Sequence, residues 1–205
     1  MISLARNVRL WFEGAKFHIT SRGIRKSWLF YEEEDYEKYL SFLEETRTRY
    51  PFHLHTYCLM TNHIHLQLET LDTPLSIIMK NLNTKYAKYI NKKYDFSGHV
   101  FDKRYGAELL NSQEYEIDVS KYIHLNPVNA GMVDEPEDYP WSSYRAYLYG
   151  EENPHIDPKS ILSYFPDPQP QQYEQYVKSA ATERFFWENG KLLKHEGAWL
   201  PCGHE

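Results

Sequence analysis

Hydrophobic and polar residues in the first part of the chain are arranged in patterns that predict strands and helices in turn. Residues 16–21 alternate with the two-residue period of a strand, and residues 33–50 repeat their apolar positions with helical spacing. Two segments rich in β-forming residues follow at 52–60 and 63–70, separated by the turn-like pair Thr61 and Asn62. We therefore expect a strand, a helix and a hairpin in that order.

The same patterns predict a second helix, a fourth strand and a third helix. The second helix begins near Pro74, a residue favoured in the first turn, and the strand lies within residues 100–110. The third helix begins after Asn111 or Ser112, either of which can cap it, and ends near Asn126 because a proline follows. This order is typical of an α+β, ferredoxin-like sandwich in which an antiparallel sheet has helices on one face.

The last third of the chain differs in composition from the rest. From residue 134 onward it is acidic and aromatic, the segment DPQP at 167–170 is typical of a short linker, and residues 171–189 are compatible with a helix. We expect a main domain at residues 10–150 and a helical C-terminal extension at residues 151–205.

Composition narrows the class of protein. The 205 residues include 41% hydrophobic residues, 23 lysines and arginines and 29 acidic residues, which gives a net charge of -6. This balance excludes a disordered or collagen-like chain and allows a core of ordinary size. No segment approaches the ~18 consecutive apolar residues of a membrane helix, and the first residues lack a continuous apolar core. We therefore expect a cytoplasmic protein with no membrane partner.

Positive charge is concentrated in one part of this acidic chain. Residues 74–104 contain seven basic and two acidic residues, a net charge of +5, which leaves -11 for the remainder. A basic strip of this kind can follow the phosphates of a nucleic acid, or it can be a solvated lysine face without a partner. The residues of the strip that we consider for DNA binding are Lys80, Lys85, Lys88, Lys103 and Arg104.

A pair of histidines on the strand expected at 63–70 can bind a metal ion. His63 and His65 share one face of a strand, ~7 Å apart along the backbone, and each neutral imidazole offers one nitrogen. A His-x-His pair alone does not define a metal site, and His53 and His55 form a second such pair on the preceding strand. The simpler interpretation of that second pair is a solvated or hydrogen-bonded strand face.

The third expected helix offers a further ligand and a nucleophile. Tyr122 and Asn126 are four residues apart and share a helix face, whereas His124 projects differently and is expected to be structural or to contact a phosphate. An amide oxygen beside a metal ion and a phenol one turn away would suit attack on a phosphodiester, because phenols need a nearby cation or base to become nucleophiles. A buried structural tyrosine is the alternative. Three other tyrosines have a potential oxygen ligand four residues later: Tyr31, Tyr147 and Tyr149.

Four ordered segments give the chain a family resemblance. They are FHITSRG at 17–23, YCLMTNHIHLQLE at 57–69, KYIHLNPVNAGMV at 121–133 and YPWSSYRAYLYG at 139–150. Together they resemble the single-tyrosine transposases of the His-hydrophobe-His superfamily, in particular the REP-associated tyrosine transposase branch. The resemblance covers about residues 10–180. It has two departures: Thr61 stands where proline is frequent, and Asn129 replaces an arginine, which would weaken a phosphate contact.

The resemblance implies a site and a reaction. His63, His65 and Asn126 would bind Mg²⁺ or Mn²⁺, and Tyr122 would attack single-stranded DNA with a hairpin-forming end. The products would be a 5'-phosphotyrosine and a free 3'-hydroxyl, and the exchange of one phosphodiester for another needs no ATP. Recognition would combine the basic strip with base stacking, for which the candidates are Trp141 and Tyr144. The protein would be a monomer or a homodimer.

Two other classes of function stay open at this point. A domesticated or inactive protein that binds single-stranded DNA in a sequence-specific way, but no longer cuts it, would account for the acidic balance and for Asn129. A small metal-dependent hydrolase is the other alternative, although the chain lacks a second carboxylate cluster and Tyr122 would have no role there.

Overall fold

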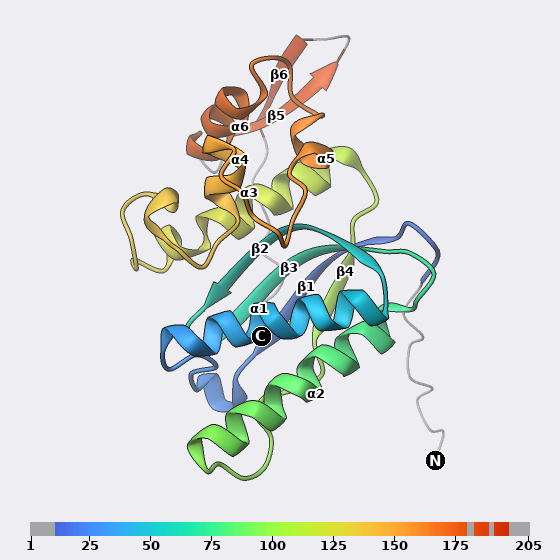
Figure 1. The fold of residues 1–205 in the computed structure, drawn as a ribbon. Coiled ribbons are helices and arrows are strands. Elements are labelled where there is room, and N and C mark those ends of the chain that lie inside the picture. The colour runs from blue at the N-terminus through green and yellow to red at the C-terminus, as the bar shows by residue number, and fades with distance from the viewer. Residues whose placement is uncertain (1–10, 180–182, 189–190, 197–205) are drawn as a thin grey trace, which may run out of the picture.

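The computed structural model describes residues 11–179 and the backbone of two further segments, 183–188 and 191–196. At its centre is a four-stranded antiparallel sheet with the strand order β2-β3-β1-β4 (Figure 1). The strands are β1 (Lys16–Arg22), β2 (Phe52–Met60), β3 (His63–Thr70) and β4 (Gly106–Leu109). This α+β arrangement confirms the predicted fold class, and β4 is shorter than the segment in which it was expected.

Two helices, α1 (Glu33–Arg49) and α2 (Leu75–Tyr94), cover one face of the sheet (Figure 1). The apolar side of β3, formed by Ile64, Leu66 and Leu68, is fully buried in the main hydrophobic core, which both helices share. Because side chains alternate along a strand, the histidines of β3 must face away from these helices. The core therefore decides which face of the sheet carries the candidate chemistry.

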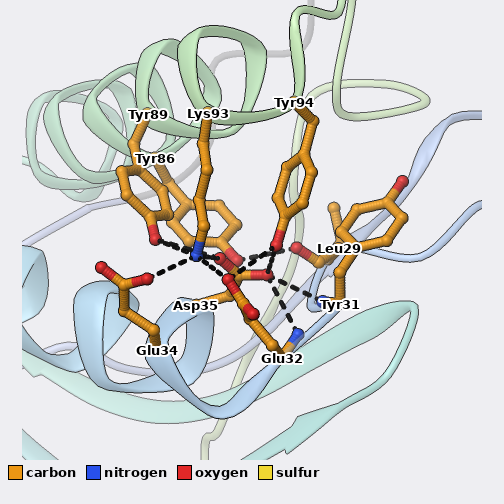
Figure 2. A network of polar contacts seen from close by, with 9 residues as sticks. All are labelled: Leu29, Tyr31, Glu32, Glu34, Asp35, Tyr86, Tyr89, Lys93 and Tyr94. Atoms are coloured by element: carbon orange, nitrogen blue, oxygen red, sulfur yellow. Dashed lines mark hydrogen bonds and ion pairs between the residues drawn. The ribbon is translucent and has the colours of Figure 1, made fainter.

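A buried carboxylate fastens α1 to the C-terminal part of α2. Asp35, whose side chain is fully buried, accepts hydrogen bonds from the backbone N–H of Tyr31 (2.8 Å) and from the hydroxyl of Tyr94 (2.7 Å). The Lys93 ammonium lies 2.8 Å from the same carboxylate and also pairs with Glu32 (Figure 2). Burial alone would raise the pKa of Asp35, but the hydrogen bonds from Lys93 and Tyr94 lower it below its ordinary value. The network fixes the helix that carries the basic strip.

Helix α3 (Gln113–Asn129) lies across the opposite face of the sheet, where it contacts β2 and β3 (Figure 1). The expectation of helices on one face therefore holds for α1 and α2 only. The predicted end of this helix at Asn126 was wrong, because Pro127 lies within the last turn and the helix continues to Asn129. The missing proline N–H costs one bond, but the backbone N–H of Ala130 still donates to the Asn126 carbonyl (3.0 Å).

The C-terminal part packs on α3 and ends in a hairpin. Its elements are α4 (Tyr144–Tyr149), α5 (Lys159–Leu162), α6 (Gln169–Lys178), β5 (Glu183–Glu188) and β6 (Lys191–Glu196). The helix expected at 171–189 was wrong in extent, because α6 ends at residue 178 and the aromatic segment after it pairs as β5 with β6. Side chains from α3, α4, α5 and α6 share a second core, so the expected boundary at residue 150 falls inside it. Within the described ranges, no helix combines the length and apolar character that a membrane span requires.

Candidate active site

The two histidines of β3 lie on the sheet face that α3 crosses. His65 is buried and His63 is half-buried, and their ring centroids are 5.0 Å apart with the rings nearly perpendicular. The pairing of β3 with β1 places Thr20 opposite His65 on the same face. The predicted pair, His63 and His65, therefore faces α3 and not the main core.

Helix α3 brings the expected tyrosine and amide to these histidines. The Asn126 Oδ1 atom lies 3.2 Å from His63 Nε2, and the Tyr122 ring meets the His65 ring edge-on with a centroid distance of 5.4 Å. One helical turn separates the two residues, so both reach the same side of the sheet. Four residues selected from the sequence thus lie together, although Tyr122 follows His65 by 57 positions in the chain.

The hydrogen bonding of His63 leaves the lone pair of its Nε2 atom available to a cation. The Asn62 amide donates to the Lys26 carbonyl (3.2 Å), which turns its oxygen toward His63, and His63 Nδ1–H donates to that oxygen (2.6 Å). Burial lowers the pKa of His63, so the imidazole is neutral and its Nε2 carries a lone pair. This lone pair faces the Asn126 oxygen, and two acceptors 3.2 Å apart repel each other unless both bind the same cation.

The donor set fits a divalent metal ion. Two imidazole nitrogens and an amide oxygen are ordinary ligands for such an ion. Among the side chains that the structure describes, no group of three or more His, Cys, Asp or Glu residues is placed to hold a metal. The third ligand would therefore be the uncharged amide of Asn126, which leaves most of the positive charge of a bound ion available to a phosphate.

A third histidine, His18 on β1, joins the site although the sequence analysis did not select it. Its Nε2 lies 3.0 Å from His65 Nδ1, the two rings are nearly parallel with centroids 5.2 Å apart, and the Tyr122 ring meets the His18 ring edge-on with a centroid distance of 5.8 Å. Burial lowers the pKa of His18 to about 4, and burial likewise holds the pKa of His65 well below its usual range. Both imidazoles are therefore neutral at physiological pH.

An exposed arginine lies beside the cluster. Arg22, the last residue of β1, is directly opposite His63 in the strand register, so both side chains leave the same face of the sheet. Its positive charge adds to the effect of burial in lowering the pKa of His63. A guanidinium in this position can form paired hydrogen bonds with a phosphate. Arg22 belongs to the FHITSRG segment, but only the strand pairing shows that it borders the histidines.

The comparison with known protein families agrees with this geometry. Residues 12–126, more than half of the chain, match the family described as "Transposase IS200 like", and the match includes every residue of the cluster described above. The chain belongs to the IS200-like transposase family. The resemblance noted in the sequence is thereby confirmed at the level of the family.

Individual relatives of this transposase point the same way. It is 29% identical over 131 residues to a protein of Haemophilus influenzae named "Putative REP-associated tyrosine transposase"; the aligned part is 56% of this chain and 74% of the relative. It also resembles the solved structure of a REP-associated tyrosine transposase bound to a REP hairpin, with a TM-score of 0.62 and 17% identity. That match covers 75% of this chain and 92% of the solved chain, and it confirms the fold.

The second histidine pair of the transposase is not assembled as a metal site. The register of β2 shifts between Leu54 and Thr56, so a β-bulge places His53 and His55 differently from the pair on β3. His55 is buried and its Nε2 lies 2.9 Å from a carboxylate oxygen of Glu69, while His53 is exposed. The expectation of a solvated or hydrogen-bonded strand face is confirmed.

His124 is a structural residue. It is fully buried, with its Nδ1 2.7 Å from the Tyr173 hydroxyl and its Nε2 2.8 Å from the Ser143 hydroxyl. Burial lowers the pKa of His124 to about 3, so the ring stays neutral inside the second core. The imidazole joins α3 to α6 and to the start of α4, and it does not reach the histidine cluster from this position.

Most of the predicted basic residues border one large groove. A cavity of about 1350 Å³ lies between α2 and residues 98–105, and we call it the α2 groove. The predicted basic residues that line it are Lys80, Lys88, Lys103 and Arg104. Lys85 was expected to join them, but it projects toward α1, where its ammonium lies 2.9 Å from Glu45. Asp102 N–H donates to the Arg22 carbonyl (3.0 Å), so the wall of the groove adjoins the arginine beside the histidines.

The two aromatic residues considered for base stacking occupy different environments. Tyr144 is fully buried in the second core, so the expectation that it stacks on a base was wrong. Trp141 is half-buried and already stacks on Tyr36, with centroids 4.5 Å apart and planes 11° apart. The aromatic residues of YPWSSYRAYLYG therefore serve to pack α4 and the residues just before it against the rest of the protein. Composition alone did not reveal this role.

Proposed function

We propose that this protein is a metal-dependent transposase that cleaves and rejoins single-stranded DNA through Tyr122. The observation that carries the proposal is the meeting of Tyr122 and Asn126 on α3 with His63 and His65 on β3. The family assignment supports DNA strand transfer as the general activity. A metal-dependent hydrolase that acts on another substrate would leave the position of Tyr122 beside the histidines without a purpose.

In the proposed reaction, the Tyr122 oxygen attacks the scissile phosphorus. A bond forms between the phenolic oxygen and phosphorus, and the bond from phosphorus to the 3' oxygen breaks. The phenolic proton passes to solvent or a base, while the departing 3' oxygen keeps the bonding electron pair and takes up a proton. Attack by the 3'-hydroxyl of another strand reverses these steps and releases the tyrosine, so no net energy source is needed.

The surrounding residues have separate roles in this proposal. His63, His65 and Asn126 would hold Mg²⁺ or Mn²⁺, which when bound polarises the phosphate and neutralises charge that develops on its oxygens. Arg22 would bind a nonbridging phosphate oxygen from the open side of the site. The imidazoles of His18 and His65, which border the Tyr122 ring, would limit the directions from which the phenol can approach.

We further propose that the α2 groove binds the DNA strand next to the scissile phosphate. Four basic side chains line the groove, and its wall is joined by a hydrogen bond to the backbone of Arg22. A strand could therefore pass from the groove to the histidine cluster without leaving a positively charged surface. A solved structural relative is bound to a REP hairpin, which supports a hairpin-forming single strand as the substrate class here.

The test of the proposed function is a covalent protein–DNA adduct. Wild-type protein is incubated with a 5'-labelled and a 3'-labelled single-stranded hairpin substrate and Mn²⁺, and the products are separated under denaturing conditions. We expect the label on the 3' side of the cut to migrate with the protein. Tyr122→Phe should abolish the adduct, and Tyr115→Phe, on the same helix, should retain it.

The possible outcomes separate the hypotheses. An adduct that persists in Tyr122→Phe would assign the nucleophile to another residue. Binding of hairpin DNA by the wild-type protein, with no adduct at any concentration of Mn²⁺ or Mg²⁺, would favour the DNA-binding protein without cleavage. Loss of the adduct in Tyr115→Phe as well would show that both substitutions act by disturbing helix α3 and not by removing the nucleophile. Thermal melting of both variants would detect such a disturbance.

A further inference from the structure

His18 is placed to control a metal ligand without being one. It lies on β1, the neighbour of β3 in the sheet, and its side chain is buried between β4 and the histidine cluster. Its Nε2 is 3.0 Å from His65 Nδ1, and the two rings are nearly parallel at 17°. The short distance means that one nitrogen donates a proton to the other.

The direction of this hydrogen bond decides whether His65 can bind a cation. The Nδ1 atom of His65 is engaged with His18, so Nε2 is the nitrogen left for a metal. A neutral imidazole with a lone pair on Nε2 carries its proton on Nδ1, and His65 must then donate to His18. In the opposite direction, His18 donates to His65 Nδ1, the proton of His65 moves to Nε2, and the ligand position is blocked.

His63 shows the same arrangement with a different partner. Its Nδ1–H donates to the Asn62 oxygen, and the hydrogen bond from Asn62 to the Lys26 carbonyl prevents the amide from turning over. Ligand histidines in metalloproteins usually donate their second N–H to such an outer partner, which fixes both the tautomer and the ring orientation. His18 occupies the corresponding place for His65, as a neutral imidazole in place of the more common carboxylate or carbonyl.

We propose that His18 is a positioning residue that accepts the Nδ1 proton of His65 and thereby holds His65 in the tautomer that binds the metal ion. The inference rests on the proposed function, because it assumes that His63, His65 and Asn126 bind a divalent cation. An uncharged acceptor also adds no negative charge to the site, so the bound ion keeps its attraction for the phosphate. Contact of the His18 ring with Tyr122 places this control directly beside the nucleophile.

Two substitutions separate the acceptor from the ring. His18→Phe keeps an aromatic ring of similar size but removes the acceptor, whereas His18→Gln removes the ring but keeps an amide oxygen at comparable reach. We expect His18→Phe to weaken Mn²⁺ binding about 10- to 100-fold, as is typical for loss of an outer partner. His18→Gln should keep most of the affinity. Binding is measured on the whole protein by electron paramagnetic resonance of Mn²⁺, with thermal melting of each variant.

A second measurement tests the inference on the wild-type protein itself, without a metal ion. Long-range proton–nitrogen NMR of ¹⁵N-histidine-labelled wild-type protein reports which ring nitrogen of His65 carries the proton. In the wild-type protein we expect the proton of His65 on Nδ1. In His18→Phe we expect the proton on Nε2, or a mixture of the two tautomers. A proton on Nε2 of His65 in the wild-type protein would overturn the inference, even if every variant failed to fold.

His63→Ala distinguishes failure of this inference from failure of the proposed function. If His63→Ala abolishes Mn²⁺ binding while a folded His18→Phe binds as tightly as wild type, His18 is not a positioning residue and the metal site stands. If His63→Ala also binds as wild type, the metal site itself is wrong and the role of His18 falls with it. Equal weakening by His18→Phe and His18→Gln would indicate that packing, and not the acceptor, matters.

Discussion

Replacing Lys80 and Lys88 together with alanine should weaken the binding of single-stranded DNA and reduce its dependence on salt. Both side chains are exposed on α2 and line the α2 groove, so each can neutralise one phosphate of a bound strand. For single-stranded DNA, each neutralised phosphate contributes about 0.7 to the slope of log affinity against log salt concentration, and two lost contacts reduce the slope by about 1.4. Between about 50 and 400 mM salt, wild type should lose about 20-fold more affinity than the variant.

The assay is fluorescence anisotropy of a labelled hairpin with a single-stranded tail, without divalent metal so that the DNA stays intact. The matched control is the double variant Lys38→Ala and Lys85→Ala, which removes the same charge from positions outside the α2 groove. Lys85 is paired with Glu45, and Lys38 lies over the Phe42 ring on α1. An equal change of slope in both double variants would refute a specific role of the groove, because overall charge would then explain the effect.

Two further predictions concern the parts of the fold that support the site. Burial lowers the pKa of His124 to about 3, so protons bind the unfolded chain near pH 6.5 but not the folded one, and stability falls as the pH drops through that window. Urea unfolding measures the decrease in the free energy of unfolding between pH 7 and pH 5. This decrease should be about 2 kcal/mol smaller in His124→Gln than in wild type, and equal decreases in the two proteins would contradict this account. Asp35→Ala should lower the free energy of unfolding by about 3–5 kcal/mol, because Lys93 and two tyrosine hydroxyls lose a buried partner; a change below about 1 kcal/mol would show that the network is not important.

Local pattern alone predicted the hairpin whose second strand carries His63 and His65. Residues 52–60 and 63–70 are rich in β-forming residues and are separated by a turn-like pair, so both strands were predicted with the bounds that the structure has. The alternation also placed His63 and His65 on one face, because period 2 is a property of the extended backbone itself. For the same reason, four-residue spacing on a helix was enough to place Tyr122 and Asn126 on one side.

Local pattern failed wherever tertiary packing decided the outcome. The burial of Tyr144 and the position of Lys85 depend on which side of a helix meets another element, and the charge or aromatic content of a segment does not contain that information. The bulge at His55 breaks the alternation of β2, and Pro127 stays in helix because its neighbours keep their hydrogen bonds. For Tyr144 and Lys85, contacts with residues from elsewhere in the chain decided the outcome.

The sequence by itself therefore determined the strands and helices of the first 130 residues, the α+β class and the residue types proposed as metal ligands, because these depend on residues that are near one another in the chain. Only the tertiary structure decided that His18 and Arg22 belong to the site, that α3 crosses the histidine face, and that the amide of Asn126 meets His63. Strand pairing and helix docking at this site join residues 41 to 63 positions apart, and the register of the strands is set by the burial of the whole core.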